Sequence, residues 1–545
     1  MRTNIDYIGR RVDEFWNRAG LVDTNPVSSR GVAPRMVWFE EAVAKGVITG
    51  EEKRRLRAQF AFLMNLFASE TCYPGDVTMC PAQTAESTEP QLCGMANQNF
   101  YTDVINVFGL GSVIFHRHPE ASSWRSKFIE RWHRQLAYHT YPESGLWEES
   151  HTYFHHVLHT LLPTLLYLRH RGYHDEFANP DFQRLLHSLL LQLTPRDFYY
   201  GGARHVVCFG DHEVNLKHYR YLLREYAEAT AAHAPQLAAH LAWAYREEGG
   251  QREMRVVPQP FPRTDRYVQG LGVMFWSRGP GEQEVLLALR SGSAWGHHHD
   301  DDGSIHFFAN GRTIVTDAAF GQNQPDEWKH RAAGASRWTL VDMEPMNYLW
   351  RFNRGWVMDR KLGPGLAYAV AYSPVFQVHG RSQRSEMLTR PALHWRTVIR
   401  LAPAIFLVID TADCVFEQEI NFHLAGEIRR VAEQRVVQDD FELLGLIPSI
   451  PMDVAGVNRP YPGDRGTEQS PVELMTTRVR FRMGSHRLAA FLLNAIPGVS
   501  AQVTDEIIEV GSERFRLGFD RDTLHIEHRE GVLQLPLFPL PHGRG

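Results

Sequence analysis

Hydrophobic residues in the first half of the chain recur at helical spacing. In the stretch 51–69 a charged first turn precedes apolar residues three and four positions apart, which is typical of an amphipathic helix. The same pattern recurs in the stretches 97–115, 122–139, 151–171, 181–193 and 216–246. Polar loops rich in Pro, Gly and Ser separate these stretches, so the pattern predicts an N-terminal domain of packed helices.

The pattern changes at 252–266, where three prolines and four arginines indicate a linker. Beyond it, short runs of β-branched and aromatic residues alternate with turn signals. These runs are 267–277, 284–290, 305–309, 313–316, 339–342, 367–371, 397–401, 405–410, 420–424, 472–483, 487–494, 506–510 and 523–530. They predict an antiparallel β-sandwich with a Pro- and Gly-rich exposed excursion at 446–466. We therefore expect a multidomain α+β protein divided into 1–255 and 256–545.

Composition and charge exclude some classes of function. The 545 residues are 43% hydrophobic and 22% charged, as in ordinary globular proteins, and the net charge of −5 gives no basic field for nucleic acid. An acidic glycan would need only a local basic patch. We expect no membrane span and, because the first residues form no apolar leader, a cytoplasmic location, or a periplasmic or secreted one if a leader has been removed. A homodimer is one assembly compatible with the sequence.

The chemistry-bearing stretch is 295–321, WGHHHDDDGSIHFFANGRTIVTDAAFG. Asn310-Gly311 tolerates the positive φ angles of a tight hairpin turn, so 304–309 and 312–316 are predicted to pair as strands. Such a hairpin brings His299 and Asp317 toward the same end of the two strands. A solvated polar loop is the structural alternative for the His and Asp run.

This stretch resembles the signature of heparinase II/III-like polysaccharide lyases: His297-x-His299-x-Asp301, then Ser304, a hairpin Gly311 and Asp317. The resemblance continues in RTVIRLAPAIFLVIDTAD, a strand pair ending in a buried Asp410, and in NFHLAGE from Asn421. It implies an N-terminal α/α toroid, incomplete as a helical barrel, and a C-terminal antiparallel β-sandwich. It also implies β-elimination on a uronic-acid glycan, so the expected partner is an anionic polysaccharide.

The resemblance assigns a catalytic group to the helical half. The stretch 145–153, GLWEESHTY, matches a family helix start in which Tyr153 is the catalytic acid, sometimes also the base. Glu149 and His156 are then candidates for contacting the substrate. A polar helix start is the structural alternative.

The resemblance places a second set of groups upstream. Asn97 matches the amide that neutralises the uronate carboxylate, and Asn99 is a further candidate for it. The family His beside this Asn is absent here, so Tyr153 or a hairpin histidine, His297 or His298, is expected to remove the C5 proton. A helix N-cap is the structural alternative for the asparagines.

The loop 201–211 resembles a family loop ending in Gly-Asp, and here Arg204 and His205 are candidates for gripping a carboxylate. An Arg paired with a structural acid is the alternative. The histidines at steps of four, His151, His155 and His159, are interpreted as cleft-facing or surface residues.

No cofactor is required for the expected chemistry, but the family implies a structural zinc. His299 and Asp317 match two of its ligands, whereas the place of the third holds Arg337, which cannot ligate a cation. An ion pair between Arg337 and Asp317 is the alternative to the metal.

Two other functions stay open at this point. A glycoside hydrolase could use Glu148, Glu149 or Asp211 as its carboxylates. A glycan-binding protein that has lost the family's catalytic His would bind uronate polymers without turnover.

Overall fold

The computed structural model of the chain describes residues 2–17, 29–73, 77–80, 91–94, 98–207, 209–210, 219–292, 301–316, 335–341, 344–345, 355–379, 385–426, 428–447, 452–461, 474–484, 486–520, 522–529 and 531–539. By compactness the chain divides into two units. We call them the helical unit (Met1–Thr140, Tyr153–Leu186 and Glu228–Ala238) and the sandwich unit (Tyr141–Thr152, His187–Ala227 and Ala239–Gly545). The boundary between the units therefore does not coincide with the change from helices to strands along the chain, because 141–152 and 187–227 belong to the sandwich unit.

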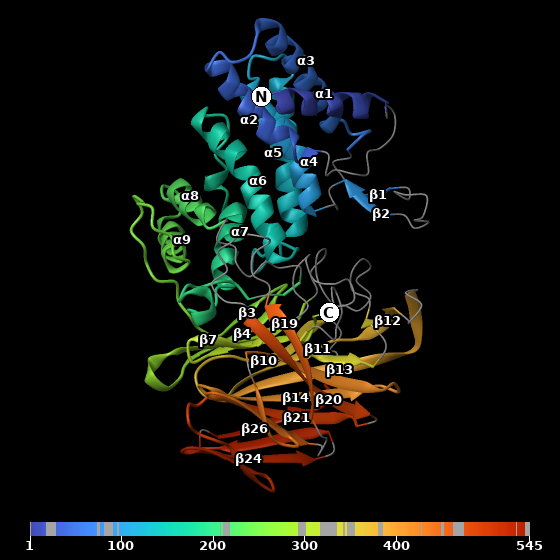
Figure 1. Cartoon of the computed structure of the whole chain (residues 1–545), viewed down its shortest axis with the longest axis vertical. Helices are drawn as coiled ribbons and strands as arrows, with labels where there is room; N and C mark the ends of the chain where they lie inside the picture. Colours follow the sequence, from blue (N-terminus) through green and yellow to red (C-terminus); the bar gives the residue numbers. More distant parts are fainter. Residues whose placement is uncertain are drawn as a thin grey trace. The chain divides into compact units, whose positions relative to one another are not determined.

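Helices occupy the first half of the chain (Figure 1). They are α1 (Arg2–Asn17), α2 (Val32–Ala44), α3 (Gly50–Phe67), α4 (Gln98–Ile114), α5 (Ala121–His139), α6 (His151–His170), α7 (Pro180–Leu191), α8 (Tyr221–Thr230) and α9 (Pro235–Glu247), with the short 3-10 helices η2 (Glu176–Ala178) and η3 (Phe198–Tyr200). The predicted helices at 51–69, 97–115, 122–139, 151–171 and 181–193 are confirmed as α3 to α7. None of the helices in the described ranges is long and apolar enough to cross a membrane.

The single helix predicted at 216–246 is wrong. Two helices, α8 and α9, stand there, and α9 begins at Pro235. Proline lacks the N–H donor of a helix interior and clashes with the preceding turn, whereas it is well suited to the first helical position. The chain therefore ends one helix and starts another.

The strands form antiparallel sheets. They are β1 (Val77–Cys80), β2 (Gln91–Gly94), β3 (Arg266–Val268), β4 (Gly272–Arg278), β5 (Glu284–Arg290), β6 (Ile305–Ala309), β7 (Arg312–Thr316), β8 (Trp338–Leu340), β9 (Glu344–Pro345), β10 (Trp356–Lys361), β11 (Ala367–Tyr372), β12 (Val375–His379), β13 (Ser385–Ala402), β14 (Ile405–Asp413), β15 (Gln418–Ala425), β16 (Arg429–Ala432), β17 (Arg435–Gln438), β18 (Phe441–Ile447), β19 (Met452–Tyr461), β20 (Leu474–Gly484), β21 (Leu488–Asn494), β22 (Gln502–Thr504), β23 (Ile507–Val510), β24 (Glu513–Asp520), β25 (Thr523–His528) and β26 (Gly531–Pro536). One large sheet runs β10-β11-β13-β14-β21-β18-β17-β16, and the other runs β19-β20-β15-β7-β6-β5-β4-β3. Helices followed by antiparallel sheets confirm the predicted fold class, and the closure of the helices into a toroid stays a prediction.

Strand β14 shows how the layers pack. Its side chains alternate between two hydrophobic clusters: Phe406 and Val408 face the second large sheet, whereas Leu407 and Ile409 face a smaller sheet, β22 to β26. A strand covered on both faces needs apolar residues at every position, because side chains alternate between the faces. This explains the unbroken run IFLVI in the sequence.

The exposed excursion predicted at 446–466 is wrong where it is described. Residues 452–461 form β19, which pairs with β20 at the edge of its sheet. An edge strand can carry a proline, because one row of its backbone groups needs no partner. Pro460 is therefore compatible with a strand here, although it is rare inside a sheet.

The hairpin predicted around Asn310-Gly311 is confirmed. Strands β6 and β7 pair antiparallel with Ala309 opposite Arg312. Both turn residues have positive φ, 55° at Asn310 and 73° at Gly311, as a tight two-residue hairpin turn requires.

Candidate active site

A buried carboxylate, Asp103 on α4, joins two helices of the helical unit. On α6, His156 Nε2 contacts Asp103 Oδ1 at 3.0 Å, and Thr160 Oγ1 donates to the same oxygen at 3.3 Å. One turn further along, Thr164 Oγ1 donates to Asn106 Oδ1 at 2.6 Å. These contacts form a polar seam between α4 and α6. Since a carboxylate accepts, Nε2 of His156 carries the hydrogen and Nδ1 is the basic ring nitrogen.

Arg30, which precedes α2, completes the seam. Its Nε donates to Asp103 Oδ2 and its Nη2 donates to Asn99 Oδ1, both at 2.5 Å. The guanidinium also lies over the Phe100 ring, 4.7 Å from its centroid. Arg30 is one-third exposed, whereas Asp103 and Asn99 are buried. Arg30 could not be predicted from the sequence, because no motif surrounds it and its partners lie about 70 residues away.

Asn99 lies inside α4, which begins at Gln98, so the N-cap alternative does not hold for this residue. Gln98 itself has a φ of 35°, a conformation that residues other than glycine rarely adopt. Such backbone is found where surrounding contacts enforce it, often at functional sites. Here Gln135 Nε2 donates to the Gln98 carbonyl oxygen at 2.6 Å.

Tyr153 is partly buried in the first turn of α6. It precedes His156 by three residues, and side chains three apart share a face of a helix. The α4–α6 seam therefore combines a phenol, a His–Asp pair and an Arg–amide pair. Together these groups can donate a proton, accept a proton and bind a carboxylate.

Both Arg204 and His205 contact acidic residues of the sandwich unit. Arg204 Nε donates to Glu247 at 2.8 Å, and its Nη1 donates to Glu284 at 2.7 Å. His205 Nε2 lies 3.1 Å from Asp197 Oδ2. Both residues are buried, so these contacts favour the structural alternative over the gripping of a substrate carboxylate.

The carboxylates weighed for hydrolysis are also buried. Glu149 is 3% exposed and accepts a hydrogen bond from Trp147 Nε1 at 2.9 Å. Glu148 is 8% exposed, and both belong to the sandwich unit. Asp211 lies outside the described residues.

Several predicted site residues fall outside the described part of the chain: Asn97, His297, His298, His299 and Asp317. At the described end of the His and Asp run, Asp302 binds backbone groups of its own unit. Asp302 accepts hydrogen bonds from the backbone N–H groups of Gly292 at 3.2 Å and Gly355 at 3.0 Å. Burial raises the pKa of Asp302.

The family-implied zinc does not fit the described part of its site. Arg337 holds the place of the third ligand, is 1% exposed and donates from Nε to the Trp338 carbonyl oxygen at 2.8 Å. A guanidinium has no lone pair for a metal and repels a cation. We therefore assign no step of the chemistry to a metal there.

A buried charge cluster lies on β13 and β14. Arg396 donates to Asp410 from Nε and Nη2, each at 2.8 Å, and His394 Nε2 lies 2.7 Å from Asp410 Oδ1. The Trp338 ring stacks on His394 at 4.6 Å. The side chains of Arg396, His394 and Asp410 have no exposed surface, which confirms the buried Asp410 expected from the sequence. Burial opposes ionisation of Asp410, but Arg396 and His394 outweigh it and lower the pKa of Asp410 to about 2.

This cluster predicts a pH dependence of stability. Burial lowers the pKa of His394 to about 4, although Asp410 works against that shift. The folded protein thus keeps His394 neutral, while the unfolded chain protonates it below its ordinary value of about 6.5. Stability should therefore fall as the pH drops from about 6.5 to about 4, by about 3 kcal/mol from this group. In thermal unfolding across this pH range, His394→Gln should show a flatter slope than the wild type, whatever its absolute Tm. Equal slopes would contradict the assignment.

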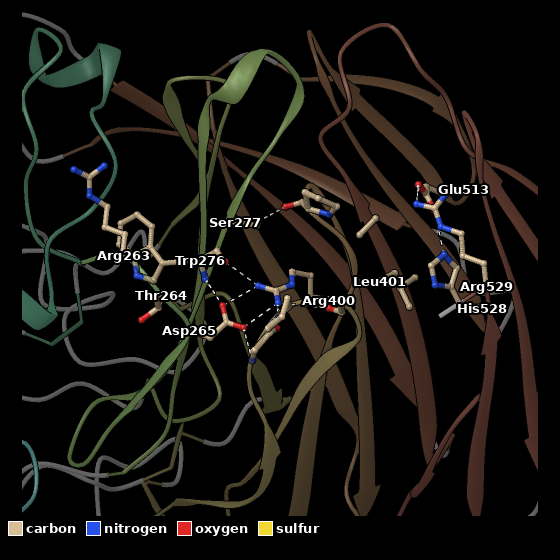
Figure 2. A pocket seen from close by; sticks show the side chains of 15 residues that line it. Arg263, Thr264, Asp265, Trp276, Ser277, Arg400, Leu401, Glu513, His528 and Arg529 are labelled. Atoms are coloured by element: carbon tan, nitrogen blue, oxygen red, sulfur yellow. Dashed lines mark hydrogen bonds and ion pairs between the residues drawn. The ribbon is translucent and has the colours of Figure 1, made fainter. Parts of the chain in front are cut away.

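The sandwich unit also holds a cavity of about 490 Å³ (Figure 2). On one wall Arg400 donates twice to Asp265, at 2.8 and 2.9 Å. On another, Arg529 and His528 contact Glu513 at 2.8 and 3.0 Å. Both Arg400 and Arg529 are paired with carboxylates, and the described lining of the cavity contains no tyrosine to act as a proton donor. The α4–α6 seam is the better candidate active site.

Comparisons with known proteins support the fold. Among solved structures, the chain is similar to a heparinase III, with a TM-score of 0.63 and 10% identity over 97% of this chain and 79% of the other. It is also similar to a heparan sulfate lyase HepC mutant from Pedobacter heparinus, with a TM-score of 0.62 and 13% identity over 96% and 78% of the two chains. No protein-family model and no curated protein sequence matches the chain. The resemblance expected from the sequence is thus confirmed at the level of the fold.

Proposed function

We propose that this chain, which has the fold of the heparinase III structures, is a polysaccharide lyase that cleaves a uronic-acid-containing glycan by β-elimination. The observation that carries the proposal is the α4–α6 seam. Tyr153 precedes His156 by three residues and so shares a face of α6 with it. Asp103 contacts both His156 and Arg30, and Arg30 contacts Asn99. These are the group types that proton abstraction next to a carboxylate requires.

In the proposed reaction, Arg30, which is one-third exposed, binds the uronate carboxylate and stabilises the charge that develops on it. The buried Asn99 and Asp103 hold the Arg30 side chain in place. His156 Nδ1 removes the C5 proton, and Asp103 stabilises the resulting imidazolium. The electron pair of the C5–H bond forms the C4–C5 double bond. The C4–O bond breaks, and Tyr153 donates its proton to the leaving glycosidic oxygen.

This scheme supplies a base where the family His is missing. His156 was expected to contact substrate, and its pairing with Asp103 supports a more direct role. His297 and His298 stay candidates for a further acid or base. Arg204 and His205 drop out of substrate binding, because Glu247, Glu284 and Asp197 already engage them.

A panel of uronic-acid polysaccharides tests the proposal, and heparan sulfate comes first because a structural neighbour is named for it. Lyase activity appears as ultraviolet absorbance, because the new double bond is conjugated to the carboxylate. New reducing ends without absorbance would indicate a glycoside hydrolase. Binding without either signal across the panel would indicate a glycan-binding protein.

Replacing His156 with Gln should lower kcat about 100-fold or more, because general base catalysis contributes at least that factor. KM should change little, since Arg30 remains to bind the carboxylate. The measurement is the initial rate of ultraviolet absorbance on the best glycan of the panel.

His159→Gln is the matched control, because His159 is an exposed histidine on the same helix. It should stay within about twofold of the wild type. Equal losses in both variants would mean that α6 as a whole, not the His156–Asp103 pair, supports activity.

A further inference from the structure

A second cluster of metal-binding groups lies in the helical unit, apart from the α4–α6 seam. His133 is on α5, whereas His174 and Glu176 come from the connection between α6 and α7. One nitrogen from each imidazole and one carboxylate oxygen lie within 4.8 Å of one another. Both His133 Nε2, at 2.8 Å, and His174 Nε2, at 2.7 Å, contact the same oxygen, Glu176 Oε2.

The other carboxylate oxygen is fixed by separate donors. Trp132 Nε1 donates to Glu176 Oε1 at 3.1 Å, and Asn179 Nδ2 donates to it at 2.8 Å. Groups that orient a ligand in this way are a regular feature of metal sites. Glu176 therefore presents one oxygen, in a fixed direction, to the two imidazoles.

Exposure divides the cluster into a rigid and an adjustable part. Glu176 has no exposed surface, while His133 is 40% and His174 24% exposed. Burial opposes ionisation of Glu176, but the hydrogen bonds from His133 and His174 outweigh it and lower the pKa of Glu176 to about 2. The carboxylate is therefore ionised, and an ion can reach it from the solvent side.

From this geometry we propose that His133, His174 and Glu176 bind a divalent transition-metal ion, with zinc as the expected occupant. Two imidazoles and a carboxylate favour zinc over the oxygen-preferring calcium and magnesium. The hydrogen bond to Glu176 raises the pKa of His133, so a metal ion competes with a proton there. On binding, the Nε2 hydrogen of each imidazole moves to Nδ1 or is released to the solvent. A water molecule would complete the tetrahedron.

The fit requires a small movement. Two ligand atoms on one tetrahedral zinc ion lie about 3.3 Å apart, which is wider than the present nitrogen–oxygen contacts. The histidines must spread by about half an ångström, and their partial exposure permits this. The bound ion would link α5 to the connection between α6 and α7. This structural role does not depend on the proposed lyase activity.

The test compares wild type, the double variant His133→Gln/His174→Gln and the control His116→Gln. Gln can still donate to Glu176 but ligates zinc poorly, and His116 is exposed at the end of α4. After chelation and reloading, elemental analysis should find one zinc fewer per chain in the double variant than in the other two. Zinc should raise the Tm of wild type and control by about 2 °C or more, and that of the double variant by less. Equal zinc content in all three proteins would overturn the proposal.

A second measurement uses the wild type alone, in case the double variant does not fold. Crystals grown with zinc should show an anomalous difference peak at the zinc edge between His133, His174 and Glu176. This readout also separates the cluster from zinc bound anywhere else on the chain. Absence of that peak at saturating zinc would mean that the three groups form a hydrogen-bond network only.

Discussion

Tyr153→Phe should lower kcat on a cleaved uronic-acid glycan about 1000-fold or more while the protein stays folded. The change deletes one hydroxyl from a partly buried side chain, so the cost in stability should be about 1 kcal/mol or less. The catalytic cost is larger, because the leaving glycosidic oxygen loses its proton donor. Substrate binding should persist, since Arg30 and Asn99 are untouched. Initial rates by ultraviolet absorbance and binding of the intact glycan measure the two effects separately.

The matched control is Tyr138→Phe, which removes the same hydroxyl from an exposed tyrosine on α5. It should retain nearly full activity. If Tyr153→Phe keeps most of its activity, the proton donor is another residue, and His297 or His298 would be examined next. If instead glycan binding is lost, the phenol serves recognition rather than proton transfer.

Local chemistry explains what the sequence could predict. Asn310-Gly311 fixes its hairpin turn through the φ angles of two adjacent residues, so no distant contact was needed. The buried Asp410 was expected from the resemblance to a family strand pair, and in the structure Arg396 stands directly opposite it. The break before α9 was also a local signal, because Pro235 disfavours a continuous helix. The prediction of a single helix at 216–246 overlooked this signal.

Contacts between distant segments explain what the sequence could not predict. Arg30 reaches Asp103 and Asn99 across about 70 residues, and no periodic pattern records such a pairing. For Arg204 the sequence suggested a substrate contact that the structure does not favour. Its guanidinium donates instead to Glu247 and Glu284, which come from two other segments of the chain. Both arginines pair with a carboxylate of the same chain, and exposure distinguishes them: the Arg204 side chain is 4% exposed, whereas that of Arg30 is 33% exposed.

Asp410→Asn should destabilise the sandwich unit by about 3–5 kcal/mol, because it leaves the Arg396 guanidinium buried without a counter-charge. Arg396 Nη1 also donates to the carbonyl oxygens of Gly303 at 2.8 Å and Ser336 at 2.6 Å. Those two hydrogen bonds fix the segments just before β6 and β8. A displaced Arg396 should therefore weaken the packing between the two large sheets. Thermal unfolding of the full chain should show a Tm lower by about 5 °C or more.

Asp413→Asn is the matched control, because it removes the same charge from an aspartate three positions further along β14. It therefore distinguishes the effect of burial from that of net charge. Asp413 is 35% exposed and pairs at the surface with Arg390 at 3.0 Å and Arg487 at 3.2 Å. Exposed pairs contribute about 1 kcal/mol or less, since water and salt screen them, so this variant should unfold close to the wild type. A comparable loss in both variants would mean that carboxylates along β14 act through net charge. A stable Asp410→Asn would mean that Gly303 and Ser336 alone can hold the Arg396 cation in the core.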